Sequence, residues 1–200
     1  MVTVEIQGNK RNNLGSKGAK EIRKEGGIPA VLYGGEDVVH FTVTPAAVKH
    51  IIYTPDFKLA DLDVDGHHYK AILKSVQFHP VTDEVIHIDF LKLIDKTPIK
   101  VEVPLRFKGT SPGVKVGGKL IQQLRKIKIK TTPSNLVDEL KADISSLDLG
   151  QALRVRDIQI PNGVEIMNNA ATPVALIEVP RALKAAAAAE AKDAAKGKKK

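Results

Sequence analysis

The stretch KRNNLGSKGAKEIRKEGGIPAVLYGG, residues 10–35, decides how the rest of the chain is arranged. Within it, residues 10–24 carry six cations and one acid, Glu21. The pattern predicts a glycine-containing loop, then a short basic helix that ends at a glycine pair, then an apolar strand. Because only Ala19 and Ile22 give the helix an apolar stripe, it cannot be stable alone and must pack against a sheet.

Three lysines of this helix, Lys17, Lys20 and Lys24, recur at helical spacing and therefore share one face. A basic loop and helix held rigidly on a sheet are typical of a surface that contacts phosphates. Runs of charge are also commonly just solvated faces of a protein. Judged by charge alone, the phosphate-contacting and the solvated interpretations are equally supported.

The net charge of +8 is unevenly distributed along the chain. Residues 1–95 contain eleven basic and thirteen acidic residues, residues 96–180 contain thirteen and eight, and residues 181–200 contain seven and two. A protein that binds any polyanion would be basic throughout. The local concentration of cations within a slightly acidic region predicts a shaped contact surface instead.

Composition excludes several classes of protein. The 200 residues suit one large or two small domains, and a hydrophobic content of 42% is sufficient for real cores. The absence of cysteine excludes disulfides, thiolate metal sites and cysteine nucleophiles, and it fits a cytosolic protein. No apolar run reaches the length of a membrane span, and the N-terminus lacks the pattern of a signal peptide.

Alternating apolar residues predict that residues 1–93 form an antiparallel β-barrel. Asp65-Gly66, between two such runs, is a strong hairpin signal, and Pro45 begins a short helix. The predicted strands cover residues 2–7, 29–33, 38–43, 58–64, 67–73, 73–78 and 85–93. About six strands and two short helices in this length suit a closed or nearly closed barrel.

The segment IDKTP, residues 94–98, is a predicted domain boundary because the composition changes after it. A second, mostly β domain is expected over residues 98–180, and residues 181–200 are expected to form a mobile basic tail of alanine and lysine. The strands or short turns of the second domain are expected at residues 99–107, 120–124, 125–133, 136–144, 153–160 and 173–179, with a glycine-rich loop at 109–118 and a turn at 162–163. The whole chain is therefore expected to be mainly β with a few short helices.

Residues 61–66, DLDVDG, copy the start of a calcium-binding loop of the EF-hand type. The twelfth position of such a loop needs a bidentate glutamate, and here that position is Ile72. Leu62 and Val64 alternate with the aspartates, as they would in a half-buried strand. The hairpin interpretation is therefore favoured over a calcium site.

Residues 113–119, GVKVGGK, nearly complete a P-loop for binding nucleotide phosphates. The next residue is Leu120, where a magnesium-binding Ser or Thr would be needed, so a glycine-rich β-loop is favoured. The six histidines show no ligand spacing, and no serine lies in a nucleophile-elbow sequence. We therefore expect no catalytic residues, no metal site, no cofactor and no small-molecule substrate.

The strand VIHIDF, which ends at Phe90, brings together two residues with polar chemistry. Ile86, Ile88 and Phe90 point to one side, which must be the core. His87 and Asp89 therefore share the other side. A solvated polar face is the commoner interpretation of such a pair. The alternative is that Asp89 accepts hydrogen bonds from a guanine amino group or a 2′-hydroxyl, or holds a neighbouring arginine in place.

Several segments occur together in a specific order and at specific separations. They are Arg11-x-x-x-Gly15, IPAVLYG at 28–34, VQ-x-HP at 76–80, HIDF at 87–90 and VEVPLRFKGTSPGVKVGGKL at 101–120. Together they resemble the bacterial large-subunit ribosomal protein L-twenty-five in its long form, the general stress protein Ctc type. The resemblance covers residues 1–180.

The resemblance implies an N-terminal barrel that binds 5S rRNA, contacts a non-Watson–Crick internal loop from the minor-groove side and has no catalytic activity. It also implies a second β domain that lies on the central protuberance of the ribosome. By resemblance, six residues fall on RNA-contacting positions: Arg11, Arg23, Tyr33, Gln77, His87 and Asp89. The full set predicted for RNA binding adds Lys10, Ser16, Lys17, Lys20 and His79. Lys20 stands where the family often has arginine, which keeps the charge but loses bidentate contact.

The function implied by the resemblance is structural: a cytoplasmic, ribosome-associated constituent of the large subunit that binds 5S rRNA. The implied partners are 5S rRNA and neighbouring large-subunit rRNA and ribosomal proteins, with no membrane partner. Two other classes stay open: a stress-induced RNA-binding chaperone or regulator acting off the ribosome, and an enzyme built on a β-barrel. A steep salt dependence with selectivity for one RNA would favour the first function, and turnover of a substrate would favour the last.

Overall fold

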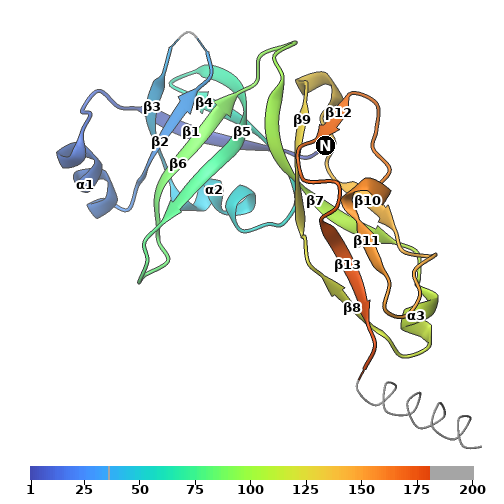
Figure 1. The fold of residues 1–200 in the computed structure, drawn as a ribbon. Coiled ribbons are helices and arrows are strands. Elements are labelled where there is room, and N and C mark those ends of the chain that lie inside the picture. Colours follow the sequence, from blue (N-terminus) through green and yellow to red (C-terminus); the bar gives the residue numbers. More distant parts are fainter. Residues whose placement is uncertain (36, 181–200) are drawn as a thin grey trace, which may run out of the picture. The chain divides into compact units, whose positions relative to one another are not determined.

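The computed structural model describes residues 1–35 and 37–180 (Figure 1). The predicted basic tail at residues 181–200 lies outside the described residues. The chain divides into two compact units. Of the described residues, the first unit comprises 1–104, 128–139 and 161–166, and the second comprises 105–127, 140–160 and 167–180.

Residues 3–92 form a closed β-barrel with two helices, which confirms the predicted barrel (Figure 1). The strands follow the order β1-β3-β2-β6-β5-β4, and β4 pairs with β1 to close the barrel. The elements are β1 (Thr3–Lys10), α1 (Ser16–Lys24), β2 (Ile28–Tyr33), β3 (Val39–Val43), α2 (Pro45–Ile52), β4 (Leu59–Val64), β5 (His67–Phe78) and β6 (Val85–Lys92). The predicted Asp65-Gly66 turn joins β4 to β5, and both of its residues have positive φ.

The barrel is mainly antiparallel, as predicted, but two of its neighbouring pairs are parallel. β1 runs parallel to β4, and β2 runs parallel to β6. A parallel neighbour requires a crossover connection, and here α1, β2, β3 and α2 lie between β1 and β4 in the chain. Alternation of apolar residues reports which side of a strand is buried. It carries no information on the direction of the neighbouring strand.

One expected strand boundary is wrong. Residues 73–78 are the second half of β5 rather than a separate strand. A register shift between Leu73 and Ser75 marks a β-bulge in β5 where it pairs with β6. The bulge breaks the period of two, because residues 71–72 are both buried and residues 74–75 are both exposed. This interrupted alternation made one strand resemble two.

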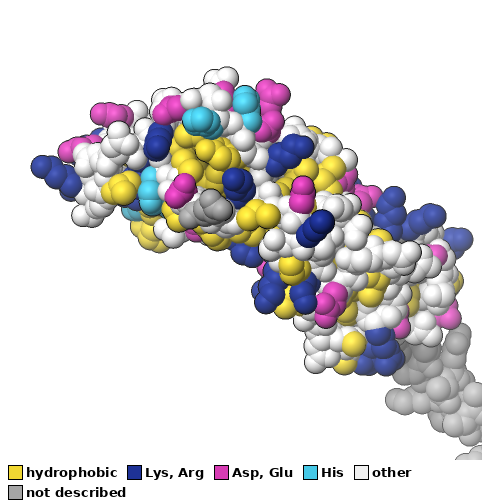
Figure 2. All heavy atoms as spheres, turned by 90° about the horizontal axis from the view of Figure 1, so that it is seen from above, with side chains coloured by type: hydrophobic (Ala, Val, Ile, Leu, Met, Phe, Trp, Pro, Cys, Tyr) yellow, Lys and Arg dark blue, Asp and Glu magenta, His cyan; other side chains and the backbone are white. Residues whose placement is uncertain are grey.

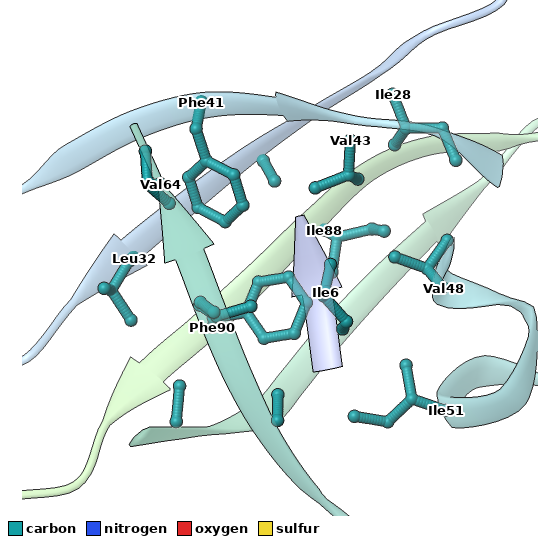
Figure 3. Packing of buried hydrophobic residues seen from close by; sticks show 14 residues of the cluster. Ile6, Ile28, Leu32, Phe41, Val43, Val48, Ile51, Val64, Ile88 and Phe90 are labelled. Atoms are coloured by element: carbon teal, nitrogen blue, oxygen red, sulfur yellow. The ribbon is translucent and has the colours of Figure 1, made fainter. Parts of the chain in front are cut away.

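The barrel core is made by inward-facing side chains of the six strands and of α2 (Figure 3). Phe41 and Phe90 are fully buried there, with ring centroids 6.0 Å apart. Gly8 on β1 is required, because a Cβ at this position would lie 2.6 Å from the Phe41 ring. Val48 and Ile51 of α2 point into the same core, and burial of each large apolar side chain contributes about 1.5–3 kcal/mol. The core therefore fixes which side of each strand faces outward.

The described residues after the barrel form two further sheets and three short helical turns. A four-stranded sheet has the order β10-β7-β9-β12, and a three-stranded sheet has the order β11-β13-β8. The elements are β7 (Ile99–Lys108), α3 (Pro112–Lys115), β8 (Lys119–Gln122), β9 (Lys126–Thr131), the 3-10 turn Pro133–Asn135, β10 (Leu140–Asp143), β11 (Ala152–Arg154), the 3-10 turn Val155–Asp157, β12 (Val164–Ile166) and β13 (Pro173–Glu178). The mostly β character of this region is confirmed, whereas the domain limits 1–93 and 98–180 stay a prediction.

Two short elements of this region were not expected from the sequence. Helix α3 lies inside the predicted glycine-rich loop and begins at Pro112, a residue that suits the first turn of a helix. Strand β12 follows the predicted turn at Gly163 and has only three residues, too few to show alternation. The helices that the structure describes are all short, and none is long and apolar enough to cross a membrane.

Candidate nucleic-acid interface

Strand register aligns the outward-facing residues of β2, β6 and β5. Asp89 on β6 lies opposite Ser75 on β5, and His87 lies opposite Gln77. Strand β2 runs along the other side of β6 and contributes Tyr33. The charge of Asp89 raises the pKa of the Tyr33 phenol. The register therefore brings together four residues that the sequence predicted, together with Ser75, which it did not. We call this surface the polar wall: Tyr33, Ser75, Gln77, His87 and Asp89.

The carboxylate of Asp89 holds two neighbours on the polar wall. Its Oδ1 lies 3.0 Å from Nδ1 of His87, and its Oδ2 accepts a hydrogen bond from the hydroxyl of Ser75. The His87 contact has ion-pair distance but is not a hydrogen bond, and within the described residues Nδ1 of His87 is buried without a hydrogen-bond partner. The side chains of His87 and Asp89 are 22% and 28% exposed, so both are held in place and can still be reached from outside.

Tyr33 adds a neutral group to the polar wall. Burial raises the pKa of Tyr33, and the nearby carboxylate of Asp89 raises it further. Both effects disfavour the phenolate form. At neutral pH the Tyr33 hydroxyl is therefore protonated, and it can both donate and accept a hydrogen bond.

Helix α1 presents its cations to solvent beside the polar wall. The side chains of Lys17 and Lys20 are exposed. Arg23 donates a 3.1 Å hydrogen bond from Nε to the carbonyl oxygen of Ile86. Because Ile86 immediately precedes His87 on β6, this bond ties the basic helix to the strand at the centre of the polar wall. The expectation that the helix packs against a sheet is confirmed.

Arg11 and His40 lie on the same outer side of the barrel. The backbone N–H of Arg11 donates to the carbonyl oxygen of His40 at 3.0 Å, and His40 and Asp89 both pair with Val31 from opposite sides. Within the described residues, Nε and Nη1 of Arg11 and Nδ1 of His40 are buried and lack hydrogen-bond partners. A buried polar group without a partner costs about 1–3 kcal/mol. An acceptor from outside, such as a phosphate or ribose oxygen, would lower that cost for Arg11.

The other residues predicted for RNA binding occupy separate places. Lys10 ends β1, and its backbone N–H faces the carboxylate of Asp65 at 3.4 Å. Ser16 begins α1 and is exposed. His79 follows β5, and its Nδ1 accepts the backbone N–H of Thr82 at 3.2 Å, so His79 shapes the turn between β5 and β6. With Nδ1 used as an acceptor, the neutral ring carries its proton on Nε2.

Sequence reasoning missed Ser75 and His40 at this surface. A signal for Ser75 existed, because it lies two residues before Gln77 and therefore faces the same side of β5. Its partner could not be found from the sequence, since the bulge after Leu73 sets the register with β6. His40 has no metal-ligand spacing in the sequence, and no other local pattern points to it. Its place beside Arg11 depends on the pairing of β1 with β3, which no local pattern reports.

Ser75, His87 and Asp89 of the polar wall are of the same residue types as a hydrolase catalytic triad, but they contact one another in a different order. In a triad, the histidine stands between the serine and the aspartate and takes the serine proton. Here Asp89 stands between Ser75 and His87, and Ser75 donates to a carboxylate. Ser75 is therefore not activated as a nucleophile. In the part of the chain that the structure describes, no group of three His, Cys, Asp or Glu side chains could hold a metal ion.

Charges elsewhere on the surface are mixed. On the face shown in Figure 2, Lys and Arg side chains are interspersed with acidic and hydrophobic ones. On the barrel, the parallel pair β1 and β4 places Glu5 opposite Asp61, and Gln7 opposite Asp63. A polyanion is repelled by this acidic side and attracted by α1. The charges near β1 and β4 therefore differ in sign from those of α1.

Two protein families match the chain in succession. Residues 6–90 match the Ribosomal L25p family, and residues 98–181 match the C-terminal domain of ribosomal protein TL5. The chain is 43% identical over 192 residues to the Large ribosomal subunit protein bL25 of Cytophaga hutchinsonii, with 96% of this chain and 100% of that protein covered. It is 40% identical over 197 residues to the protein of the same name from Bacteroides thetaiotaomicron, with coverages of 96% and 100%. It is 44% identical over 189 residues to that of Porphyromonas gingivalis, with coverages of 94% and 98%.

Proposed function

The chain belongs to the bL25 family of large ribosomal subunit proteins, and from this premise we propose that it binds 5S rRNA at the central protuberance. Its role is that of a structural constituent of the ribosome. Its other partners are the neighbouring large-subunit rRNA and ribosomal proteins. It works in the cytoplasm, needs no cofactor and catalyses no reaction.

The observation that supports this proposal most is the placement of a basic helix beside a polar wall on one rigid barrel. The hydrogen bond from Arg23 to Ile86 joins the two. Lysines and arginines suit the phosphates, which fix position but carry no sequence information. Neutral or acceptor side chains suit sugars and base edges, where an RNA can be distinguished from others.

The shape of RNA explains why both parts are needed. An A-form helix has a wide, shallow minor groove that displays 2′-hydroxyls and base edges. The polar wall is formed by strands, so its side chains lie on a broad surface that can approach such a groove. Helix α1 stands at its side, where the flanking phosphates would lie. Recognition is therefore of RNA shape, supported by charge.

We assign the residues to these two kinds of contact. Phosphates are contacted by cations at the end of β1 and on α1, helped by the hydroxyl that begins α1: Lys10, Arg11, Ser16, Lys17, Lys20 and Arg23. Sugars and base edges are contacted by residues on or next to the polar wall: Tyr33, Gln77, His79, His87 and Asp89. Ser75 is left out of both groups because its hydroxyl donates to Asp89.

A titration with two RNAs tests the proposal. Labelled 5S rRNA and a matched RNA whose internal loop is replaced by regular base pairs are titrated with the full chain at several salt concentrations. We expect tighter binding of 5S rRNA at every salt concentration, because the sugar and base contacts do not release counterions. Equal binding of the two RNAs would contradict the proposal. Footprinting of 5S rRNA in purified ribosomes, with and without the protein, distinguishes a ribosomal role from one off the ribosome.

A further inference from the structure

We propose that Ser75 is a positioning residue for RNA recognition: through Asp89 it holds His87 with Nδ1 protonated, so that Nε2 offers a lone pair to a hydrogen-bond donor on the RNA. This inference rests on the proposed function, which it deepens by naming the chemistry of one contact. It concerns three side chains in series, joined by a hydroxyl–carboxylate bond and a 3.0 Å carboxylate–imidazole contact.

The backbone of β5 aims Ser75 at Asp89. The two residues are direct register partners on neighbouring strands. The register shift after Leu73 restarts the alternation at Ser75, so that this side chain joins Gln77 on the outer face. A β-bulge re-aims the side chains that follow it. Without the bulge, the residue at this position would point toward the core side, and Asp89 would lose its second partner.

The chemistry of the three groups favours one tautomer of a neutral His87 ring. A carboxylate only accepts hydrogen bonds, so the imidazole nitrogen 3.0 Å from Asp89 Oδ1 must carry a proton for the contact to be favourable. A neutral imidazole has one N–H, which leaves the lone pair on Nε2. The terminal torsion of an aspartate is broad and otherwise weakly fixed. The bond from Ser75 to Oδ2 holds that torsion, and with it the carboxylate oxygen that faces His87.

The partner of Nε2 on the RNA must be a donor. Phosphate oxygens are acceptors only, so a neutral His87 in this tautomer gains nothing from a phosphate. The donors on the minor-groove side of RNA are the ribose 2′-hydroxyl and the 2-amino group of guanine. His87 keeps 22% of its side-chain surface exposed, which leaves its edge available to such a donor. The shared chemistry is an N–H or O–H that points outward from a minor groove.

The tautomer is measured on the free protein. Long-range 15N–1H correlation spectra of the His87 ring are recorded for the full chain, for Ser75→Ala and for Asp89→Asn, with the exposed Ser146→Ala as a matched control. We expect the Nδ1–H form in the wild type and in the control. A mixture is expected for Ser75→Ala, and a shift toward the Nε2–H form for Asp89→Asn, whose amide can donate to Nδ1. A wild-type Nε2–H form or imidazolium at neutral pH, or an unchanged spectrum in Ser75→Ala, would overturn the proposal.

The role in binding is measured with 5S rRNA. Ser75→Ala should weaken binding by about threefold to tenfold, the scale of one lost hydrogen bond. Ser75→Thr, which keeps the hydroxyl and suits a strand, should restore it. If Ser75→Ala fails to fold, Asp89→Asn gives the same test, because it keeps the shape and changes only the acceptor. Wild-type affinity in a folded Ser75→Ala or Asp89→Asn protein would overturn the inference.

Modified RNAs distinguish the two sources of the donor. His87→Ala is titrated against 5S rRNA, against RNA with 2′-deoxy residues in the internal loop, and against RNA with inosine in place of its guanosines. If the donor is a ribose, the penalty of His87→Ala disappears on the deoxy RNA, and if it is a guanine, it disappears on the inosine RNA. A penalty that persists on both would reject a donor partner. Failure of the wild type to select 5S rRNA would refute the proposed function, while the spectra still decide the tautomer by themselves.

Discussion

Helix α1 and the polar wall lie side by side on the barrel, joined through Arg23, but their polar groups are used in opposite ways. The lysines of α1 are exposed and extend into solvent. Asp89 holds Ser75 through a hydrogen bond and lies 3.0 Å from His87, and these side chains stand on β5 and β6, whose other faces pack into the core. Helix α1 therefore offers exposed positive charge, whereas the polar wall offers hydrogen-bonding groups that point in fixed directions.

This difference separates two properties of an RNA-binding protein. Exposed cations gain affinity by releasing counterions, for any RNA and in proportion to the phosphates they neutralise. Groups that are already fixed by internal bonds lose little freedom on binding and suit only RNA atoms in matching positions. Affinity at low salt should therefore depend on α1, and selectivity on the polar wall.

Truncating Phe90 should disrupt both α1 and the polar wall, because both regions depend on β6. Phe90 is fully buried against Phe41, so Phe90→Ala should open a cavity and lower the free energy of unfolding by about 3–5 kcal/mol. Urea denaturation followed by circular dichroism measures the effect. The control is Val81→Ala, a residue that is 84% exposed and should change stability by no more than about 0.5 kcal/mol. Similar small losses for both variants would show that β6 does not pack as described.

Replacing Asp89 should distinguish an interface that depends on oriented hydrogen-bonding groups from one that depends only on electrostatic attraction. If the interface were only electrostatic, Asp89→Ala would remove a negative charge and tighten RNA binding. Because Asp89 holds His87 and Ser75, we expect weaker binding of 5S rRNA by about 1–3 kcal/mol, with the salt slope nearly unchanged. Titration at several salt concentrations gives both quantities. A folded variant that binds as well as the wild type would leave only a basic surface as the explanation.

Replacing Lys17 should have the complementary effect. Lys17→Ala removes one exposed cation from α1, so the slope of log K against log salt should fall by about one unit, equally for 5S rRNA and for the matched RNA. The matched control is Lys49→Ala, an exposed lysine on α2, which should leave the slope unchanged. A loss of selectivity in Lys17→Ala would contradict the assignment of selectivity to the polar wall alone. The same slope change in both variants would contradict a specific role of α1 in phosphate binding.

Shortening the chain should have the smallest effect. Every residue of α1 and of the polar wall lies before residue 94, so a fragment of residues 1–93 should fold and bind 5S rRNA with the Kd of the full chain. A fragment of residues 1–104, which keeps the start of β7 in the first compact unit, serves as the control for stability. If 1–104 folds but binds weakly, residues 105–200 take part in the RNA site.

The sequence predicted the barrel and the outward pairing of His87 with Asp89 because both follow from alternation along single strands. Ile88 and Phe90 are fully buried, and the two polar residues between and before them face outward, as the period of two requires. The basic helix was found for a similar reason: its charges and its two glycines are local. Local patterns were sufficient wherever one strand or one helix decided the outcome.

Within the barrel, the features that the sequence did not reveal depend on two strands at once. Register determines the bulge near Lys74 and the partner of Ser75. It also determines the parallel pairings of β1 with β4 and of β2 with β6. His40 beside Arg11 belongs to the same class. Register is set by the packed core and the connections of the whole barrel, and residue alternation within one strand does not contain it. What the residues of the candidate site do on RNA stays a prediction.

The closure of the barrel by β1 and β4 also has a consequence for how the chain reaches this structure. Thr3 of β1 pairs with Leu59 of β4, so this edge of β1 stays uncovered during synthesis until the later strand β4 has been made. Pairings between distant residues slow folding, because loop-closure entropy is lost before the contacts form. Until β4 arrives, β1 exposes an unpaired edge that another chain could pair with. We therefore expect folding to be slow for this size of barrel and limited by the docking of β1, with aggregation competing while that strand is free.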